Sequence, residues 1–293
     1  MAPRPASRTQ ADSGSEAKAI GAVGRAIAGS KPRRVRNGGC DDMGKAEAGA
    51  AGKMLDILSG FDHRFPSGTA REIAQRTNIS ESTLFRLLRR LHQRGYLWHD
   101  AVSRRYGPGL KLIQLGDVVL RELHIPDAVK VILDDLQTAS AENANFNIWR
   151  GGTHRTCIAV SHSALALREF IGVGGTHGLW LGASGKAIAA FLSPTLQMRI
   201  AEKADDTTKG REAFLHSLAE VQDSGISITA GERVEGVMAL SAPVFDGAEI
   251  IGSLTVSGPA FRIESKAKKI RPLVIQKAKE LSLSFAEQHE REI

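Results

Sequence analysis

Residues 80–94 carry hydroxyl and guanidinium groups at spacings that a helix would bring to its outer side. These polar and basic residues are Ser82, Thr83, Arg86, Arg89, Arg90 and Arg94. Hydroxyls form hydrogen bonds with the edges of nucleic-acid bases, and a guanidinium pairs with guanine through two hydrogen bonds or binds a backbone phosphate. We expect Arg86 to contact a base and the three later arginines to contact phosphates.

The apolar residues of the same stretch predict the helix that would present these groups. Four leucines stand at positions i, i+3, i+4 and i+7, which is one face of an α-helix: Leu84, Leu87, Leu88 and Leu91. Ser80 is a suitable N-cap, and Gly95 is a typical residue for a helix end. Phe85 lies off the apolar face, so it either packs against the wing that follows the helix or contacts the methyl group of a thymine.

Two more helices and a hairpin are expected around the basic helix. The helices cover residues 48–59, with Met54, Leu55 and Leu58 on one side, and 70–77, after the N-cap Thr69, and the strands cover 96–99 and 103–106. Three helices followed by a hairpin predict a winged helix-turn-helix, in which the third helix enters the major groove of DNA. Arg104 and Arg105 in the hairpin would reach the adjacent backbone or the minor groove.

The positive charge is concentrated in the first third of the chain. Residues 1–108 contain 19 Lys and Arg against 10 Asp and Glu, whereas residues 109–293 contain 20 against 22. This asymmetry favours a polyanionic partner for the N-terminal part, and nucleic acid is the commonest such partner. A trihelical packing module with a solvated basic surface is the alternative.

The overall composition is that of a globular protein with two domains. Of the 293 residues, 42% are hydrophobic and 24% are charged. No apolar run reaches the ~18 residues of a membrane span and no signal-peptide core is present, so we expect a cytoplasmic protein without membrane contact. Cys40 and Cys157 are far apart in the sequence and do not indicate a disulfide framework.

We expect four segments: a flexible basic tail (1–47), the winged helix-turn-helix domain (48–109), a linker helix (110–124) and a larger C-terminal domain (125–293). In the C-terminal domain the pattern predicts helices over 126–141, 184–204, 209–222 and 264–289, and strands near 143–150, 155–161, 165–171, 226–230, 237–244 and 249–257. Mixed runs of strands and helices predict an α+β fold.

Five motifs along the chain are informative in combination. They are Ile79–Leu88 with Gly95–Leu97, Arg105–Leu112 with Leu115 and Gly116, Ala183–Ala190, Gly236–Asp246, and Leu254–Pro259. In this order and spacing they resemble the IclR family of bacterial transcriptional regulators, over roughly residues 48–290. The resemblance implies a GAF/PAS-like α/β effector domain, a homodimer or homotetramer, and a palindromic operator in double-stranded DNA. It also implies control of a metabolic or catabolic operon through a small organic effector, often a carboxylate.

Residues 178–185 are the expected effector site, because this glycine-containing segment precedes a predicted helix whose first amides favour an anion. The resemblance implies that Leu179, Ala183 and Ser184 line the site, with matching positions on the later strands at Thr229, Val237, Ala239, Thr255 and Ser257. Trp180 departs from the usual family pattern and would form a wall against a planar or aromatic ligand. Ordinary strand hydroxyls and core residues are the alternative at these positions.

No combination of residues predicts a catalytic site, and neither a cofactor nor a metal is expected. Gly185-Lys186 lacks the preceding glycine and the following Ser or Thr of a phosphate-binding loop. His154, Cys157 and His162 have loosely metal-like spacing, so a metal-assisted hydrolase fused to a DNA-binding domain is the alternative function. A third possibility is a DNA-binding protein whose C-terminal domain only oligomerises. His177, beside the glycine-containing segment, is a candidate partner for an anionic ligand.

Overall fold

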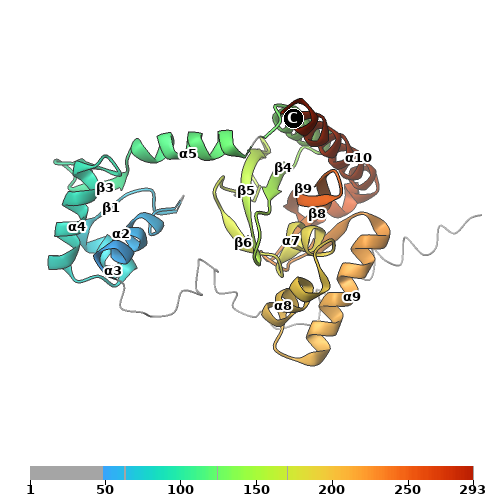
Figure 1. Ribbon diagram of the computed structural model, residues 1–293, viewed down its shortest axis with the longest axis horizontal. Coiled ribbons are helices and arrows are strands. Elements are labelled where there is room, and N and C mark those ends of the chain that lie inside the picture. Colours follow the sequence, from blue (N-terminus) through green and yellow to red (C-terminus); the bar gives the residue numbers. More distant parts are fainter. Residues whose placement is uncertain (1–48, 63, 124, 170, 293) are drawn as a thin grey trace, which may run out of the picture. The chain divides into compact units, whose positions relative to one another are not determined.

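The computed structural model describes residues 49–62, 64–123, 125–169 and 171–292, and the chain divides into two compact units between Ile125 and Pro126 (Figure 1). The basic tail expected over residues 1–47, including Cys40, lies outside the described residues. No helix in the described ranges combines the length and the apolar character that crossing a membrane requires.

The N-terminal unit is a winged helix-turn-helix, as the sequence predicts. Its helices are α2 (Ala50–Ser59), α3 (Ala70–Thr77), α4 (Glu81–Gln93) and α5 (Lys111–Glu122). Its strands are β1 (Gly68–Thr69), β2 (Leu97–Asp100) and β3 (Arg105–Pro108), which form an antiparallel sheet in the order β1-β3-β2. The hairpin of β2 and β3 is the wing.

Local sequence signals define the turn between α3 and α4. Thr69 and Glu72 form a capping box at the start of α3, with the Thr69 hydroxyl accepting from the Glu72 amide and the Glu72 carboxylate accepting from the Thr69 amide. Asn78 ends α3 in the left-handed conformation, with φ 55°. Ser80 precedes α4 as expected, but its hydroxyl bonds to the Thr83 hydroxyl at 3.1 Å instead of capping a backbone amide.

The leucine face of α4 forms the centre of the core of this unit. Leu84, Leu87 and Leu88 are fully buried and pack with residues of the other elements: Ile57, Ala70, Ile73, Ile79, Leu91 and Leu97. In α2 the core residue is Ile57, whereas Leu55, which the sequence pattern placed on the inner side, is 60% exposed. Gly109 packs so closely on the Gly95 backbone that any side chain there would collide with it, and the wing is thereby held against the end of α4.

The C-terminal unit is an α+β domain built on one antiparallel sheet. The strands are β4 (Asn143–Ile148), β5 (His154–Ser161), β6 (Thr176–Gly178), β7 (Ser227–Ala230), β8 (Val237–Asp246) and β9 (Glu249–Pro259), in the order β6-β5-β4-β9-β8-β7. The helices are α6 (Ala128–Ser140), α7 (Gly182–Ala189), α8 (Pro194–Ala204), α9 (Thr208–Ser224) and α10 (Ala260–Glu292). The predicted fold class is confirmed.

The two faces of this sheet differ sharply in chemistry. One face carries Phe146, Leu240 and Val256, and α6 and α10 pack against the central strands (Figure 1). Phe146, for example, lies 5.9 Å from the ring centre of Phe285 in α10. Because side chains alternate along a strand, the intervening residues point to the opposite face, and most of them are polar. The start of α7 packs near that polar face, against β7, β8 and β9.

Two elements differ from the sequence prediction. Residues 165–171 were expected to form a strand, but the described residues of this segment are irregular and the next strand is β6. Backbone carbonyls of this segment accept hydrogen bonds from side chains and not from a neighbouring strand. Asn143 donates to the Glu169 carbonyl, and Arg262 donates to the Leu167 carbonyl. The helix expected over 184–204 is two helices, because Pro194 has no amide proton and begins α8.

Candidate nucleic-acid interface and effector site

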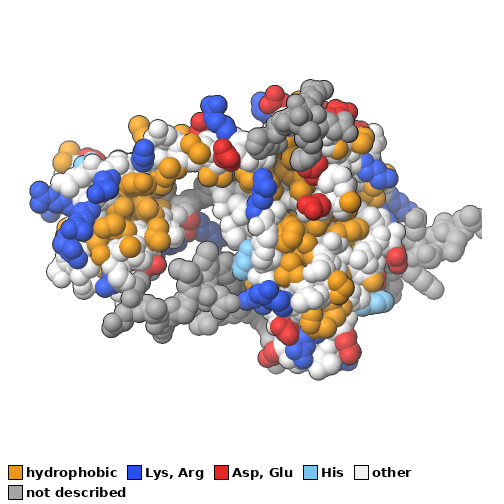
Figure 2. Space-filling view, viewed as in Figure 1, with side chains coloured by type: hydrophobic (Ala, Val, Ile, Leu, Met, Phe, Trp, Pro, Cys, Tyr) orange, Lys and Arg blue, Asp and Glu red, His pale blue; other side chains and the backbone are white. Residues whose placement is uncertain are grey.

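The outer face of α4 is basic and largely unoccupied by the rest of its unit. Ser82, Arg86, Arg89, Arg90 and Arg94 are exposed, and Thr83 is half-buried beside them. Figure 2 shows Lys and Arg side chains gathered over this helix. The stripe of leucines on the inner side fixes which residues face outward, so the predicted DNA-contacting residues of α4 share one surface.

Phe85 lies on this same outer face and is 54% exposed. It does not belong to the apolar core of the unit, and this favours the thymine contact over packing against the wing. Ser82, one turn earlier, and Arg89, one turn later, flank it on the helix surface. An apolar ring therefore stands among hydroxyl and guanidinium groups on the face expected to enter DNA.

The two arginines of the wing have different surroundings. Arg104 is exposed in the turn of the hairpin, with a left-handed φ of 54°. Arg105, whose side chain is 37% exposed, bonds to its own unit: its Nη2 donates to the Ser67 carbonyl at 2.6 Å, its Nε donates to the Ser67 hydroxyl at 3.1 Å, and its Nη1 lies 3.3 Å from the Glu72 carboxylate. These contacts connect β3 to the start of α3, so Arg105 positions the wing.

In the C-terminal unit, a buried arginine organises the segment that leads into α7. Arg155 on β5 is 2% exposed and donates to the Ser184 hydroxyl at 2.7 Å, to the Leu181 carbonyl at 2.9 Å and to the Gly178 carbonyl. Burial, and then the charge of Arg233, lower the pKa of Arg155 to about 9. Sequence reasoning missed this residue, because its partners lie more than 20 residues away and no local pattern marks it.

The strand register brings most of the predicted effector residues together. Thr229 pairs with Ala239 and Ala239 with Ser257, while Thr255 pairs with Ser241, so all of these side chains lie on the polar face of the sheet. Val237 lies two residues before Ala239 and shares its face. The row continues onto β4 with Asn143, Asn145 and Asn147, which are buried and were not anticipated.

The first residues of α7 connect to this polar face. The Ala183 amide donates to the Thr229 hydroxyl at 3.0 Å, and the Ser184 carbonyl accepts from Ser253 at 3.1 Å. Ala183, Ser184 and Thr229 therefore belong to one site, together with Arg155. Ser241 and Thr255 are hydrogen-bonded to each other at 2.7 Å across β8 and β9.

Two predicted effector residues lie elsewhere. Leu179 is fully buried in the apolar core, where it packs with residues such as Ile188 of α7 and Leu218 of α9. Trp180 packs partly against the same core, with the ring of His154 5.2 Å from its own in an edge-on arrangement, and with Lys203 above it at 5.6 Å. Leu179 therefore packs against apolar residues, and Trp180 packs against apolar residues, an imidazole and an ammonium group. Both differ in this from the predicted effector residues on the polar face of the sheet.

Two carboxylates, Glu169 and Glu232, complete the site, and both pair with cations. Glu169, 8% exposed, pairs with Arg233 and accepts from the Ser257 hydroxyl at 2.9 Å. Glu232 pairs with Lys186 of α7 at 2.5 Å and accepts from the Gly182 amide at 3.2 Å. The amide at the start of α7, where the sequence suggested an anion site, therefore contacts a carboxylate of the chain itself.

The residues of the hydrolase alternative do not form a metal site. Among the described residues, no group of three or more His, Cys, Asp or Glu is arranged to hold a metal ion, so His154, Cys157 and His162 are not brought together as ligands. Burial raises the pKa of the Cys157 thiol to about 11, which disfavours the thiolate that a metal ligand or nucleophile requires. Burial also lowers the pKa of His177 to about 4, with the charge of Arg155 adding to the effect.

A winged helix with a basic outer face, followed by an α+β domain with a buried polar site, defines a DNA-binding transcriptional regulator. Two family models match the chain: "IclR helix-turn-helix domain" over residues 50–101 and "Bacterial transcriptional regulator IclR C-terminal" over residues 118–283. The chain belongs to the IclR family. The family is one of transcriptional regulators and gives the hydrolase alternative no support.

Curated relatives agree with this assignment. The chain is 28% identical to the HTH-type transcriptional regulator BhcR of Paracoccus denitrificans over 266 residues, which is 87% of this chain and 94% of that protein. It is 29% identical to the glycerol operon regulatory protein of Streptomyces griseus, over 73% of this chain and 84% of that protein.

Solved structures share the fold at low sequence identity. An IclR homolog from Microbacterium hydrocarbonoxydans, crystallised with 4-hydroxybenzoate, matches with a TM-score of 0.69 and 16% identity, over 81% of this chain and 99% of that one. A transcriptional regulator from Rhodococcus sp. RHA1 matches with a TM-score of 0.68 and 21% identity, over 81% of this chain and 98% of that one.

Proposed function

We propose that this regulator controls a metabolic or catabolic operon in response to a small organic carboxylate, which binds between the start of α7 and the polar face of the sheet. The observation that carries the proposal is the Arg155-organised site, where the Ala183 amide, the Ser184 hydroxyl and the Thr229 hydroxyl meet. Amide, hydroxyl and guanidinium groups in a buried setting are the groups that bind an organic anion. The 4-hydroxybenzoate held by the Microbacterium relative is of this chemical class.

The DNA side of the proposal assigns roles to the outer face of α4. Arg86 contacts a base, the later arginines of α4 and Arg104 contact phosphates, and Ser82 and Thr83 adapt to the bases beside Arg86. Arg105, from its contacts with Ser67 and Glu72, supports the wing from within. The protein acts as a cytoplasmic homodimer or homotetramer on a palindromic operator, with domain limits at 48–109, 110–124 and 125–293.

The direct test is binding of the full-length protein to duplex fragments from its own genomic neighbourhood at low ionic strength, with and without a panel of carboxylates. We expect at least one fragment to bind, and one carboxylate to change the affinity. Thr229→Val and Ser257→Ala should weaken that response, while Ser284→Ala in α10, whose hydroxyl donates to the Glu280 carbonyl of the same helix, should not. Indifference to every duplex fragment would refute the regulator assignment.

Two arginine variants separate base contact from phosphate contact. Arg86→Ala should reduce the difference in binding free energy between the preferred base and the other bases by about 1–3 kcal/mol at one position of the operator. Arg90→Ala should weaken binding to all duplexes alike and reduce the slope of log affinity against log salt by about 1. Selection from a random duplex pool and a salt titration measure these effects, and normal behaviour of both variants would show that the assignment of α4 is wrong.

A further inference from the structure

The loop between β7 and β8, residues 231–236, reaches back to the first turn of α7. It begins at Gly231 and ends at Gly236, with φ 71° and 76°, a backbone conformation that glycine adopts without the strain of a side chain. Its middle residues are largely exposed, and the loop makes two ionic contacts with the rest of the unit. We call residues 231–236 the strap.

The first ionic contact of the strap places a carboxylate on α7. Glu232 lies with one oxygen 2.5 Å from the Lys186 ammonium and the other 3.2 Å from the Gly182 amide nitrogen. The Lys186 side chain is only 16% exposed, whereas that of Glu232 is 35% exposed. The Lys186 ammonium and the Gly182 amide thus form a binding position for a carboxylate, which we call the seat. The partly exposed Glu232 side chain occupies it.

The second ionic contact joins the strap to the strand face of the effector site. Arg233 pairs with Glu169, whose other oxygen accepts from Ser257. Consecutive strap residues therefore contact α7 directly on one side and, through Glu169, the predicted effector residue Ser257 on the other. Any ligand that displaces the strap reaches both parts of the site.

The charges around the seat favour an added anion. Lys186, Arg155 and Arg233 are three cations, and Glu232 and Glu169 are two carboxylates. Among the described residues no carboxylate is paired with Arg155, which is held instead by a hydroxyl and carbonyl groups. The group carries one net positive charge with Glu232 in place and two once Glu232 has left, so an incoming anion is favoured in either case.

We propose that Glu232 is a built-in competitor of the effector: the effector's carboxylate takes the Gly182 amide and the Lys186 ammonium, expels Glu232, and frees the strap. This inference rests on the proposed function, in which the same site binds a small carboxylate. The selectivity of the site then depends on how well a ligand's carboxylate outcompetes a tethered one. Lys186 is a binding residue for the effector, and Glu232 sets the concentration at which the effector acts.

Trypsin provides a position-specific test on the full-length protein, because it cleaves after Arg233 in the strap. Without any ligand, Glu232→Gln should raise the rate of cleavage after Arg233 by about fivefold, because cleavage follows the population of the released loop. Lys186→Gln should act in the same direction. Glu235→Gln, at an exposed position of the strap, is the matched control and should not change the rate. Mass spectrometry of the peptide that ends at Arg233 measures the cleavage rate. Equal rates in the wild type and the three variants would overturn the proposal.

Acetate is the probe for the competition between an added carboxylate and Glu232, because it is small and carries little besides its carboxylate. Acetamide is the neutral control of similar size. In the wild-type protein, acetate at tens of millimolar should accelerate cleavage after Arg233, whereas acetamide should have no effect. Glu232→Gln should be cleaved at its raised rate with or without acetate, because it has no carboxylate left for acetate to expel. Equal effects of acetate and acetamide on the wild-type protein, or an acceleration of Glu232→Gln by acetate as large as that of the wild type, would overturn the proposal.

The two proposals fail in distinguishable ways. If a carboxylate such as 4-hydroxybenzoate changes operator binding while cleavage after Arg233 stays constant, the proposed function stands and the competitor role is wrong. If acetate frees the strap but no carboxylate in the panel changes operator binding, the competitor role stands and the regulatory assignment of the site is wrong.

Discussion

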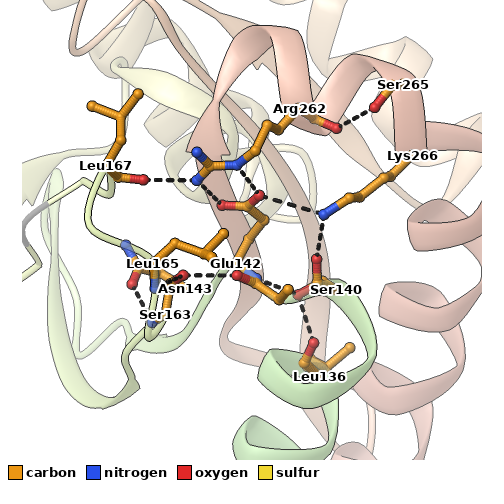
Figure 3. A network of polar contacts seen from close by, with 11 residues as sticks. Leu136, Ser140, Glu142, Asn143, Ser163, Leu165, Leu167, Arg262, Ser265 and Lys266 are labelled. Carbon is orange, nitrogen blue, oxygen red and sulfur yellow. Dashed lines mark hydrogen bonds and ion pairs between the residues drawn. The ribbon is translucent and has the colours of Figure 1, made fainter.

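Glu142 and Arg262 form a two-point ion pair, with Nε and Nη2 of the arginine at 2.6 and 2.8 Å from the two carboxylate oxygens, although 120 residues separate them (Figure 3). Glu142 is fully buried at the start of β4, and Arg262 lies in the first turn of α10. The same guanidinium donates to the Leu167 carbonyl at 2.7 Å, in the irregular segment that also carries Glu169. This pair therefore helps to fix Glu169, a carboxylate of the proposed effector site, from outside that site.

Removing one partner of this pair should be strongly destabilising. Arg262→Met leaves the buried Glu142 with Lys266 alone, at 3.6 Å, and should lower the free energy of unfolding by about 3 kcal/mol. Urea unfolding of the full-length protein measures the loss, and Arg271→Met on the same helix is the control that should stay within about 0.5 kcal/mol. The double variant Glu142→Leu/Arg262→Met should recover part of the loss, and a strictly additive double variant would contradict this account.

Arg155→Met should affect both stability and effector response. It removes donors from Gly178, Leu181 and Ser184, and buried acceptors without partners cost about 1–3 kcal/mol each. We expect the free energy of unfolding to fall by about 3 kcal/mol and the effect of carboxylates on operator binding to be lost. Arg199→Met, an exposed substitution in α8, should change neither quantity. A variant at Arg155 that keeps the full effector response would show that the guanidinium does not organise the site.

Phe85 should contact the methyl group of a thymine. A duplex selected by the wild-type protein, resynthesised with deoxyuridine in place of thymidine, should bind about fourfold more weakly for each contacted methyl group. Phe85→Ala should bind the thymidine duplex more weakly and should not distinguish it from the deoxyuridine duplex. If both proteins show the same penalty for deoxyuridine, the methyl groups are recognised by another residue.

The stability of the C-terminal unit should depend on the protonation of His177. Its pKa is lowered from 6.5 to about 4 in the fold, mainly by burial, so the folded state holds the ring neutral while the unfolded chain binds a proton below pH 6.5. The contribution of the neutral His177 ring to the free energy of unfolding is complete above pH 6.5 and is lost as the pH falls towards 4. Between pH 7.5 and pH 5 the free energy of unfolding should fall by about 2 kcal/mol from this group.

His177→Gln removes the titrating ring and should flatten the pH profile over this range, whereas His216→Gln, at an exposed position of α9, should leave the profile unchanged. Urea unfolding at several pH values measures both variants. A His177→Gln protein with the same pH dependence as the wild type would show that other groups cause it.

The helices and the N-terminal unit were predictable because their signals are local. The leucine spacing in α4, the Thr69 N-cap and the glycine after the helix each act within a few residues. These signals also determine which arginines face outward, so the candidate DNA-contacting face could be assigned without a structure. Strand alternation similarly placed Thr229, Ala239 and Ser257 on one side of the sheet.

The effector site was only partly predictable, because its decisive contacts join distant residues. Arg155, Glu169 and Arg233 carry no periodic pattern, and their pairing depends on which strands lie side by side. The same holds for Leu179, whose apolar side chain was directed into the core between α7 and α9.

The sequence by itself determined most of the helices and strands and the outward basic face of this protein, because periodicity and capping depend on neighbours along the chain. The tertiary structure alone decided that residues 165–169 form no strand, that Arg105 bonds to Ser67 within its own unit, and that Glu232 occupies the seat at Lys186. Burying a charge requires a partner, and that partner is chosen by proximity in space rather than in sequence.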